Sequence, residues 1–196
     1  MILKIVVGGS VQVDDNERER TRSRVKSLDE VQREVMTFLR EEAGFAQVYT
    51  INREGYPVGR TMVAPINDDW SVTLVQRTVH RRLSQLRRDP HVEIAWVGSP
   101  APDSINDRPH VYDFGWLIPR VVFLRGIARF MNEEEMVAEF QRQTLTQRAK
   151  GLTSAPERTI ENIKEELVGL RVTPAQIRVE GFGVGAQSFT WKAEEM

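Results

Sequence analysis

The amino-acid sequence predicts an α+β domain: a mostly antiparallel sheet or small barrel with helices packed around it. Short β-rich segments follow one another across tight turns, and connections this short favour antiparallel neighbours. Other segments show the apolar spacing of amphipathic helices. The chain has 196 residues, 40% of them hydrophobic, which is enough for one core, so we expect a single domain over residues 27–196.

An extension precedes this domain. Residues 2–7 are apolar and largely β-branched, which favours a short strand. Residues 14–26 are almost wholly charged or polar, which indicates an exposed connector. We therefore treat residues 1–26 as an N-terminal extension, which either extends the sheet or contacts a partner subunit.

The domain begins with a helix. Ser27-Leu-Asp-Glu30 is a capping box, in which each of the two end side chains accepts a hydrogen bond from the other residue's backbone N–H. Apolar residues then recur at helical spacing. The pattern predicts a helix from Ser27 to about Ala43, ended by Gly44.

Strands follow, over residues 45–52, 58–66 and 70–75, because these segments are rich in β-branched and aromatic residues. The segments between them, 53–57 and 67–69, are rich in Gly, Pro, Asn and Asp and predict turns.

The remaining segments alternate between the two kinds of periodicity. A helix is predicted over residues 78–88, and Asp89-Pro90 ends it because the residue before a proline is disfavoured in the helical region. The later elements are a strand at 91–97, a long loop at 98–116, a strand at 121–130, helices at 133–143 and 157–170, and strands at 172–181 and 188–192.

Composition excludes several classes of protein. The chain has no cysteine, so a disulfide framework, a thiolate nucleophile and a zinc site built on cysteine are all excluded. Its histidines, His80, His91 and His110, are scattered, which does not favour a metal site. No segment has the roughly 18–20 apolar residues of a membrane span. The N-terminus lacks the pattern of a signal peptide, and we expect a cytoplasmic protein.

The segment 78–90 carries the first indication of function. With Thr78 as N-cap, His80, Arg81 and Arg82 lie in the first helical turn, where the helix dipole disfavours cations. A bound anion would resolve this conflict, because free backbone N–H groups and two guanidinium groups together suit a phosphate. The alternative is a solvated basic helix whose arginine stems cover apolar surface. Arg87 and Arg88, in the last turn, fit a structural role.

Two runs of sequence extend this argument. They are Gln47-Val-Tyr-Thr-Ile-Asn-Arg-Glu-Gly-Tyr-Pro-Val-Gly-Arg60 and His80-Arg-Arg-Leu-Ser-Gln-Leu-Arg-Arg-Asp-Pro-His-Val-Glu-Ile-Ala-Trp96. Over residues 29–97 the chain resembles the pyridoxamine 5′-phosphate oxidase-like, FMN-binding split barrels. The resemblance implies a split β-barrel with flanking helices, an FMN cofactor, and a homodimer with cofactor sites at the subunit interface.

The resemblance also implies cofactor-binding residues. Arg60 matches the arginine of the strand that contacts FMN, and Thr61, Met62 and Val63 would run beside the flavin ring. Val75 and Gln76 match the end of the next strand, which approaches the flavin.

The match continues into the basic helix. Arg81 and Arg82 match the pair that holds the FMN phosphate, and His80 stands where a serine is common. The helix-dipole argument points to the same two arginines.

The departures from the family narrow the function. Pro65 stands where pyridoxamine 5′-phosphate oxidase has a lysine, and residues 179–196 lack its Arg-x-His motif, so pyridoxamine phosphate is not the expected substrate. Haem-degrading relatives need a C-terminal histidine, and none follows His110. Other relatives bind a deazaflavin, coenzyme F420, which is the alternative cofactor.

Aromatic residues supply candidates for covering a bound ring: Tyr112, Phe114 and Trp116 in the long loop, and Trp191 near the C-terminus. Packing against the barrel or a second subunit is the alternative role. His110 is a candidate proton donor.

The sequence thus favours a flavin-dependent oxidoreductase that transfers a hydride to or from a small organic substrate. A flavin-storing or flavin-sensing protein without turnover is the second hypothesis. Nucleic-acid binding through residues 77–90 is the third, and the near-zero net charge of −1 disfavours it.

Overall fold

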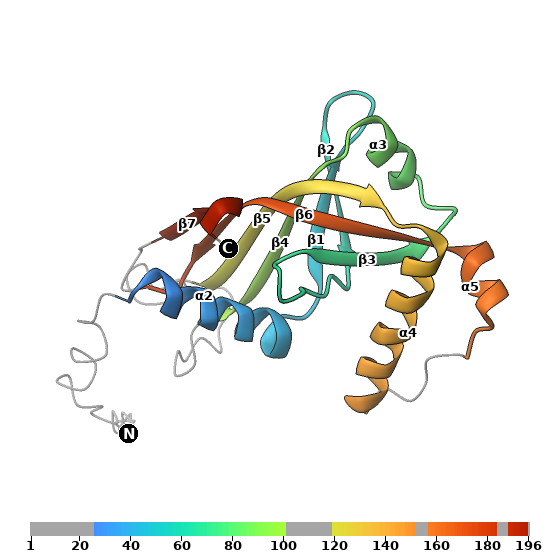
Figure 1. Ribbon diagram of the computed structural model, residues 1–196. Helices are drawn as coiled ribbons and strands as arrows, with labels where there is room; N and C mark the ends of the chain where they lie inside the picture. The colour runs from blue at the N-terminus through green and yellow to red at the C-terminus, as the bar shows by residue number, and fades with distance from the viewer. Residues whose placement is uncertain (1–25, 101–118, 152–156, 184–187, 196) are drawn as a thin grey trace, which may run out of the picture.

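A computed structural model describes residues 26–100, 119–151, 157–183 and 188–195 of the chain. The strands form one antiparallel sheet in the order β2-β1-β4-β5-β6-β3, and β7 pairs with β6 (Figure 1). Their bounds are β1 Ala46–Ile51, β2 Pro57–Met62, β3 Val72–Arg77, β4 His91–Pro100, β5 Pro119–Phe130, β6 Leu167–Glu180 and β7 Ser188–Lys192.

The sheet is an open, split barrel. β2 and β3 follow each other in the chain, yet they lie at opposite ends of the strand order. The expected α+β fold with a mostly antiparallel split barrel is therefore confirmed. Helices pack on this sheet, with bounds α2 Leu28–Thr37, a π-helical turn η1 Phe38–Glu42, α3 Arg82–Arg88, α4 Glu133–Ala149, α5 Ile160–Glu166 and a 3-10 turn η2 Ala193–Glu195.

The first helix forms as its sequence predicts. The Ser27 side chain accepts from the Glu30 backbone N–H, and the Glu30 side chain accepts from the Ser27 backbone N–H. The helix continues as the π-helical turn up to Ala43, which ends it. Its buried face, with Val31, Val35 and Phe38, joins the core of the barrel.

Two later helices differ from their predicted bounds. α4 continues to Ala149, beyond the predicted end at residue 143. The helix predicted over residues 157–170 ends at Glu166, because Leu167 opens β6 and pairs with Arg77 of β3. The spacing of a short apolar run does not by itself distinguish a helix from a strand. Here the long-range pairing of residues 167–172 with β3 determines that they form a strand.

Trp191 belongs to the core. Its side chain is fully buried and packs edge-on against Trp70, with ring centroids 5.5 Å apart. The suggestion that Trp191 covers a bound ring is therefore wrong, and packing against the barrel is its role. Trp70 has a φ of 61°, a conformation that costs a bulky residue about 1–3 kcal/mol and that its burial offsets.

Several predictions concern residues outside the described part of the chain: the strand at 2–7, the connector up to residue 25, and Tyr112, Phe114, Trp116 and His110 of the long loop. Within the described part, no helix is long and apolar enough to cross a membrane.

We expect Gly126→Ala to destabilise the fold by about 1–3 kcal/mol, the usual cost of overpacking a core. Gly126 lies where the β5–β6 register shifts, and a Cβ there would collide with the backbone carbonyl oxygen of Thr173. Gly44→Ala is the matched control, because a Cβ at Gly44 would meet no atom within 4 Å. Urea unfolding of the two variants measures the difference, and equal stabilities would contradict the expectation.

A pH-dependent contribution to stability lies at the start of α4. Arg129 donates two hydrogen bonds to Glu135, of 2.8 and 2.9 Å, and these bonds together with the Asn132 backbone N–H lower the pKa of Glu135 from 4.5 to about 2. A lowered carboxyl pKa stabilises the folded state above the unfolded pKa, and the contribution is lost as pH falls through the folded pKa.

Glu135→Gln is therefore expected to lower the free energy of unfolding at about pH 6 and to lower it much less near pH 2, since the wild-type carboxylate takes up a proton in between. Denaturant unfolding at several pH values measures this, with the exposed neighbour Glu134→Gln as control. A difference that does not change with pH would contradict the expectation.

Candidate functional site

A pocket of about 600 Å³ lies where the sheet stays open. One wall comes from the end of β2 and another from the end of β3, while α3 and α4 supply the remaining sides. Its lining residues are Phe45, Thr61, Met62, Val63, Val75, Gln76, Arg77, His80, Arg82, Phe140, Gln143, Thr144, Gln147, Arg158 and Leu167.

Most of the residues predicted from the sequence meet in this pocket: Thr61, Met62, Val63, Val75, Gln76, His80 and Arg82 all line it. Arg60 and Arg81 do not. Arg60 is exposed on β2 and donates to the carbonyl of Gly59, over 2.8 Å. Arg81 lies at the N-cap of α3, and its carbonyl accepts from Ser84.

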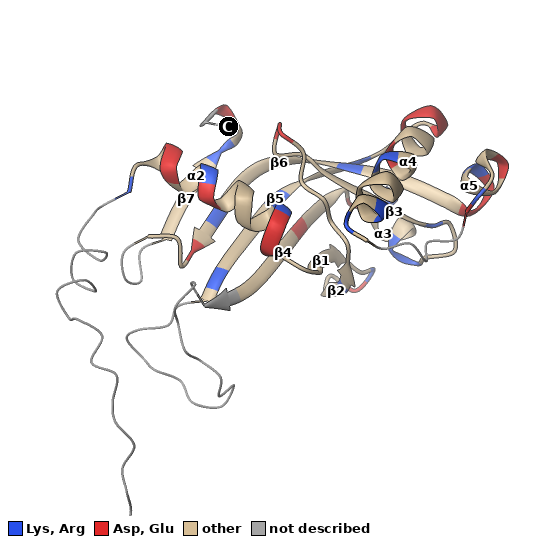
Figure 2. Ribbon diagram, turned by 90° about the horizontal axis from the view of Figure 1, so that it is seen from below, with Lys and Arg blue, Asp and Glu red and all other residues tan. Residues whose placement is uncertain are grey.

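The basic helix begins later than predicted. Thr78 is not its N-cap, because β3 continues to Arg77 and the chain needs residues 78–81 to turn. The Thr78 backbone N–H instead donates to the Glu166 carbonyl, over 2.9 Å. α3 starts at Arg82 and spans seven residues, so its dipole contributes less than a long helix would. Arg81 and Arg82 nevertheless stand at its N-terminal end, and Figure 2 shows the basic residues along it.

Arg82 and Gln76 form a pair inside the pocket. The Arg82 Nε donates to the Gln76 side-chain carbonyl, and burial, with the nearby charge of Arg60, lowers the pKa of Arg82. Within the described residues, Arg82 has no acidic partner at ion-pair distance. A half-buried cation in this position favours an anionic ligand.

Gln76 itself is only 5% exposed. Because its carbonyl is engaged by Arg82, its amide nitrogen faces elsewhere, and Nε2 has no hydrogen-bond partner among the described residues. Buried amide donors are nearly always satisfied. The Gln76 amide is therefore an available donor for a ligand carbonyl.

Arg77 and Arg158 also line the pocket, and none of the described residues that line it is acidic. Burial and the charges of Arg82 and Arg77 lower the pKa of His80, which favours neutral imidazole at pH 7. Arg158 forms an ion pair with Glu166 of α5. The pocket thus has an electropositive rim around apolar walls.

Sequence reasoning missed the contribution of α4 and of the segment before α5 to the pocket. Phe140, Gln143, Thr144, Gln147 and Arg158 all follow the motif-bearing segment by more than forty residues. Arg158 falls in a segment predicted to be an ordinary amphipathic helix, and no local pattern indicates that these side chains reach β3.

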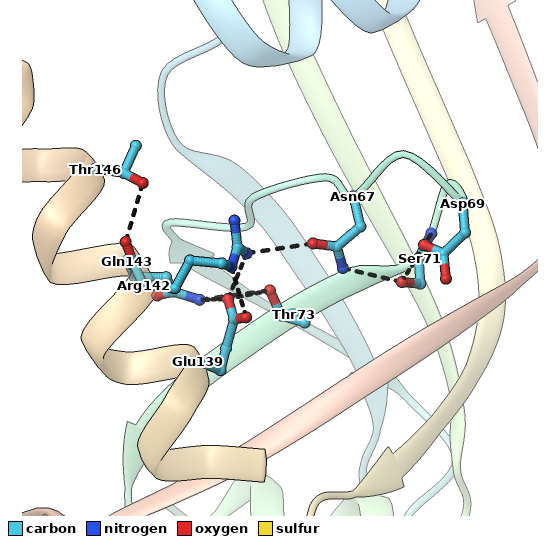
Figure 3. A network of polar contacts seen from close by, with 8 residues as sticks. All are labelled: Asn67, Asp69, Ser71, Thr73, Glu139, Arg142, Gln143 and Thr146. Atoms are coloured by element: carbon cyan, nitrogen blue, oxygen red, sulfur yellow. Dashed lines mark hydrogen bonds and ion pairs between the residues drawn. The ribbon is translucent and has the colours of Figure 1, made fainter.

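A buried polar network fixes α4 against β3 (Figure 3). The Glu139 carboxylate, 7% exposed, accepts from the Thr73 hydroxyl over 2.7 Å, from Arg142 over 2.6 and 2.9 Å, and from the Gln143 amide over 2.7 Å. Burial opposes its charge, but these donors outweigh burial and lower the pKa of Glu139. Arg142 also donates to the side-chain oxygen Oδ1 of Asn67 over 3.2 Å, so the network extends into the β2–β3 connection.

A second cavity of about 600 Å³ adjoins the pocket and shares Val63, Gln143 and Gln147 with it. Pro65 lines this second cavity. In the described part of the chain, no group of three or more His, Asp and Glu residues is placed to hold a metal ion.

Comparison with solved structures finds the same fold at low sequence identity. A haem-binding protein from Mycobacterium smegmatis superposes with a TM-score of 0.57 at 15% identity, over 87% of this chain and 60% of that one. A putative 5-nitroimidazole antibiotic resistance protein from Bacteroides thetaiotaomicron gives 0.54 at 14% identity, over 85% and 87%.

A third structure comes from Clostridium acetobutylicum, a protein related to general stress protein 26 and described as of the pyridoxinephosphate oxidase family. It gives a TM-score of 0.52 at 13% identity, over 85% of this chain and 95% of that one. None of the curated proteins matches this chain. The family model described as pyridoxamine 5′-phosphate oxidase matches residues 31–180, which include every strand but β7 and all of the pocket. The chain belongs to the pyridoxamine 5′-phosphate oxidase-like family.

Proposed function

We propose that this pocket binds a phosphate-bearing flavin and that the chain is an oxidoreductase. FMN is the cofactor we favour and coenzyme F420 is the alternative. The reaction is hydride transfer to or from a small organic substrate other than pyridoxamine phosphate, because Pro65 replaces a lysine expected in enzymes that oxidise that molecule and residues 179–196 lack their Arg-x-His substrate motif.

The Gln76–Arg82 pair carries this proposal. A buried amide donor without a partner suits a ring carbonyl, and the adjacent half-buried guanidinium, with no acidic partner in the described chain, suits a phosphate. Arg81 and Arg60 stand near enough in the fold to add to the phosphate site. The apolar side chains of Met62, Val63, Val75 and Phe140 suit the faces of a flat ring.

When bound, such a cofactor supplies the hydride transfer itself. The chain's residues would bind and orient it: Arg82 holds the phosphate, Gln76 donates to a ring carbonyl, and α4 excludes water from one side. The adjoining cavity, which shares Val63 with the pocket, is the place for a small substrate. Because Arg82 points inward to Gln76 instead of outward, we propose no nucleic-acid partner.

The test is the absorbance spectrum of the purified protein, followed by fluorescence titration with FMN and with F420. We expect micromolar or tighter binding of one of them, and its loss in Arg81→Ala plus Arg82→Ala. Binding of neither ring would overturn the proposal, and binding of haem alone would replace it. Reduction of the bound ring without reoxidation by any substrate would favour a storage or sensing protein.

We also propose a homodimer, formed through the outer face of the sheet. Large apolar side chains on adjacent strands are exposed there: Tyr49 on β1 is 36% exposed, Val97 on β4 64% and Ile127 on β5 41%. Tyr49 and Ile127 line a shallow hollow of about 620 Å³ on this face. Exposed apolar groups on neighbouring strands favour burial against a second surface.

Ile127→Glu is expected to weaken this dimer by about 100-fold or more, since it places an unpaired charge on the apolar face that we propose is buried. The mass in solution, followed by light scattering across a dilution series, measures the change. Ile160→Glu, at an exposed isoleucine on α5, is the control. A monomeric wild type would contradict the dimer and leave the pocket proposal standing.

A further inference from the structure

We propose that Gln143 makes the pocket selective for a ring that carries an imide N–H, and that its side-chain carbonyl accepts a hydrogen bond from that N–H. Glu139 is the positioning residue that orients the Gln143 amide. This inference rests on the proposed function and goes beyond it, because it concerns a residue of α4 that no sequence motif indicates.

The orientation of the Gln143 amide follows from the chemistry of its partner. Glu139 is buried and accepts two hydrogen bonds from the Arg142 guanidinium and one from the Thr73 hydroxyl (Figure 3). A carboxylate so surrounded is ionised, and an ionised carboxylate accepts hydrogen bonds but donates none.

The Gln143 side-chain nitrogen Nε2 donates a hydrogen bond to Glu139 Oε1 over 2.7 Å. The opposite amide orientation would place two acceptor oxygens against each other, so the nitrogen must face Glu139. The nitrogen is also 3.4 Å from the Thr73 hydroxyl, which gives it a second contact on the same side.

This arrangement leaves the Gln143 carbonyl for the pocket. Gln143 lines the pocket together with Phe140, one helical turn earlier on α4, so a ring bound there would meet an aromatic side chain from the same helix. No donor among the described residues reaches Gln143 Oε1. The pocket therefore offers a ligand one oriented acceptor from α4.

Gln76 offers the complementary group. Arg82 fixes its carbonyl, and its buried Nε2 is an unpartnered donor in the described structure. The pocket thus presents one oriented donor and one oriented acceptor, each set by a charged neighbour. The imide of a flavin or deazaflavin ring has carbonyl acceptors and one N–H donor, so this ring chemistry can satisfy both glutamines, whereas a ring with acceptors alone cannot.

The experiment compares the ring that the wild type binds, FMN or F420, with its analogue methylated at the imide nitrogen. Affinities are measured by fluorescence for wild type, Gln143→Leu, Glu139→Gln and the double variant. Gln141→Leu is the matched control, because Gln141 is exposed on the same helix and lines neither cavity.

We expect Gln143→Leu to weaken binding of the natural ring about tenfold, the effect of one hydrogen bond in a water-poor site, and to abolish discrimination against the methylated analogue. Glu139→Gln is expected to weaken binding severalfold. The double variant is expected to bind no more weakly than Gln143→Leu alone, because Glu139 acts through Gln143.

Unchanged discrimination in Gln143→Leu, or losses that add in the double variant, would overturn the inference. If Glu139→Gln fails to fold, the comparison of wild type with Gln143→Leu still decides it. A wild type that binds neither ring would refute the proposed function instead, and a wild type that binds both forms of the ring equally would refute this inference alone.

Discussion

Replacing Arg82 with methionine is expected to weaken FMN binding by about 10- to 150-fold, the range for losing hydrogen bonds to a charged group. The methionine keeps the apolar stem and removes the guanidinium that lies half-buried beside Gln76, without an acidic partner in the described chain. Because the lost contact is to the phosphate, the affinity for riboflavin, which has no phosphate, should change little. Fluorescence titration of the variant with both molecules measures the contrast.

Arg88→Met is the matched control for this experiment. Arg88 lies in the last turn of the same helix and donates to the carbonyl of Ile51, over 2.7 Å, so it is a basic residue outside the pocket. Equal losses of FMN and riboflavin affinity in Arg82→Met would show that the substitution damages the pocket and that Arg82 does not hold the phosphate.

Gln76→Glu is expected to produce a larger loss, of about 100-fold or more, and to affect riboflavin as well as FMN. The carboxylate keeps an acceptor for Arg82 Nε, so the local contact survives. It replaces the buried N–H donor by an anionic oxygen, which repels a ring carbonyl. Because riboflavin has no phosphate, the loss of riboflavin affinity in this variant measures the ring contact alone.

Gln85→Glu makes the same chemical change outside the pocket. Gln85 lies on α3, and its carbonyl accepts from the Thr50 hydroxyl over 2.6 Å, a bond that a glutamate can also accept. Full retention of ring binding in Gln76→Glu, with normal binding in Gln85→Glu, would show that Gln76 does not contact the ring.

The parts of the fold that local chemistry determines could be predicted from the sequence. The capping box at Ser27 and Glu30 forms as expected, and β7 has the predicted bounds. Both depend on side chains close together in the chain, where propensity and spacing are informative. Gln76 and Arg82, which the sequence assigns to one site, also line the same pocket. These two residues are only six positions apart in the chain.

The parts that depend on distant pairing could not be predicted. Residues 167–170 look helical in isolation and become strand because β3 pairs with all four of them and β5 pairs with Leu170. α3 starts later than the sequence predicts for a similar reason, because pairing with β6 holds the chain extended up to Arg77. The contribution of Glu139 and Gln143 requires α4 to lie against β3, and no spacing within α4 specifies that neighbour.

The pocket lies between β2 and β3, and the residues that line it are largely different from those that form the buried core. The main buried core draws on α2, α3 and the strands of the sheet, and of the described residues that line the pocket only Met62 belongs to it. Substitutions along the pocket can therefore alter shape and charge without opening cavities in the interior. Such an architecture can exchange one bound molecule for another over evolutionary time while its folding requirements stay constant.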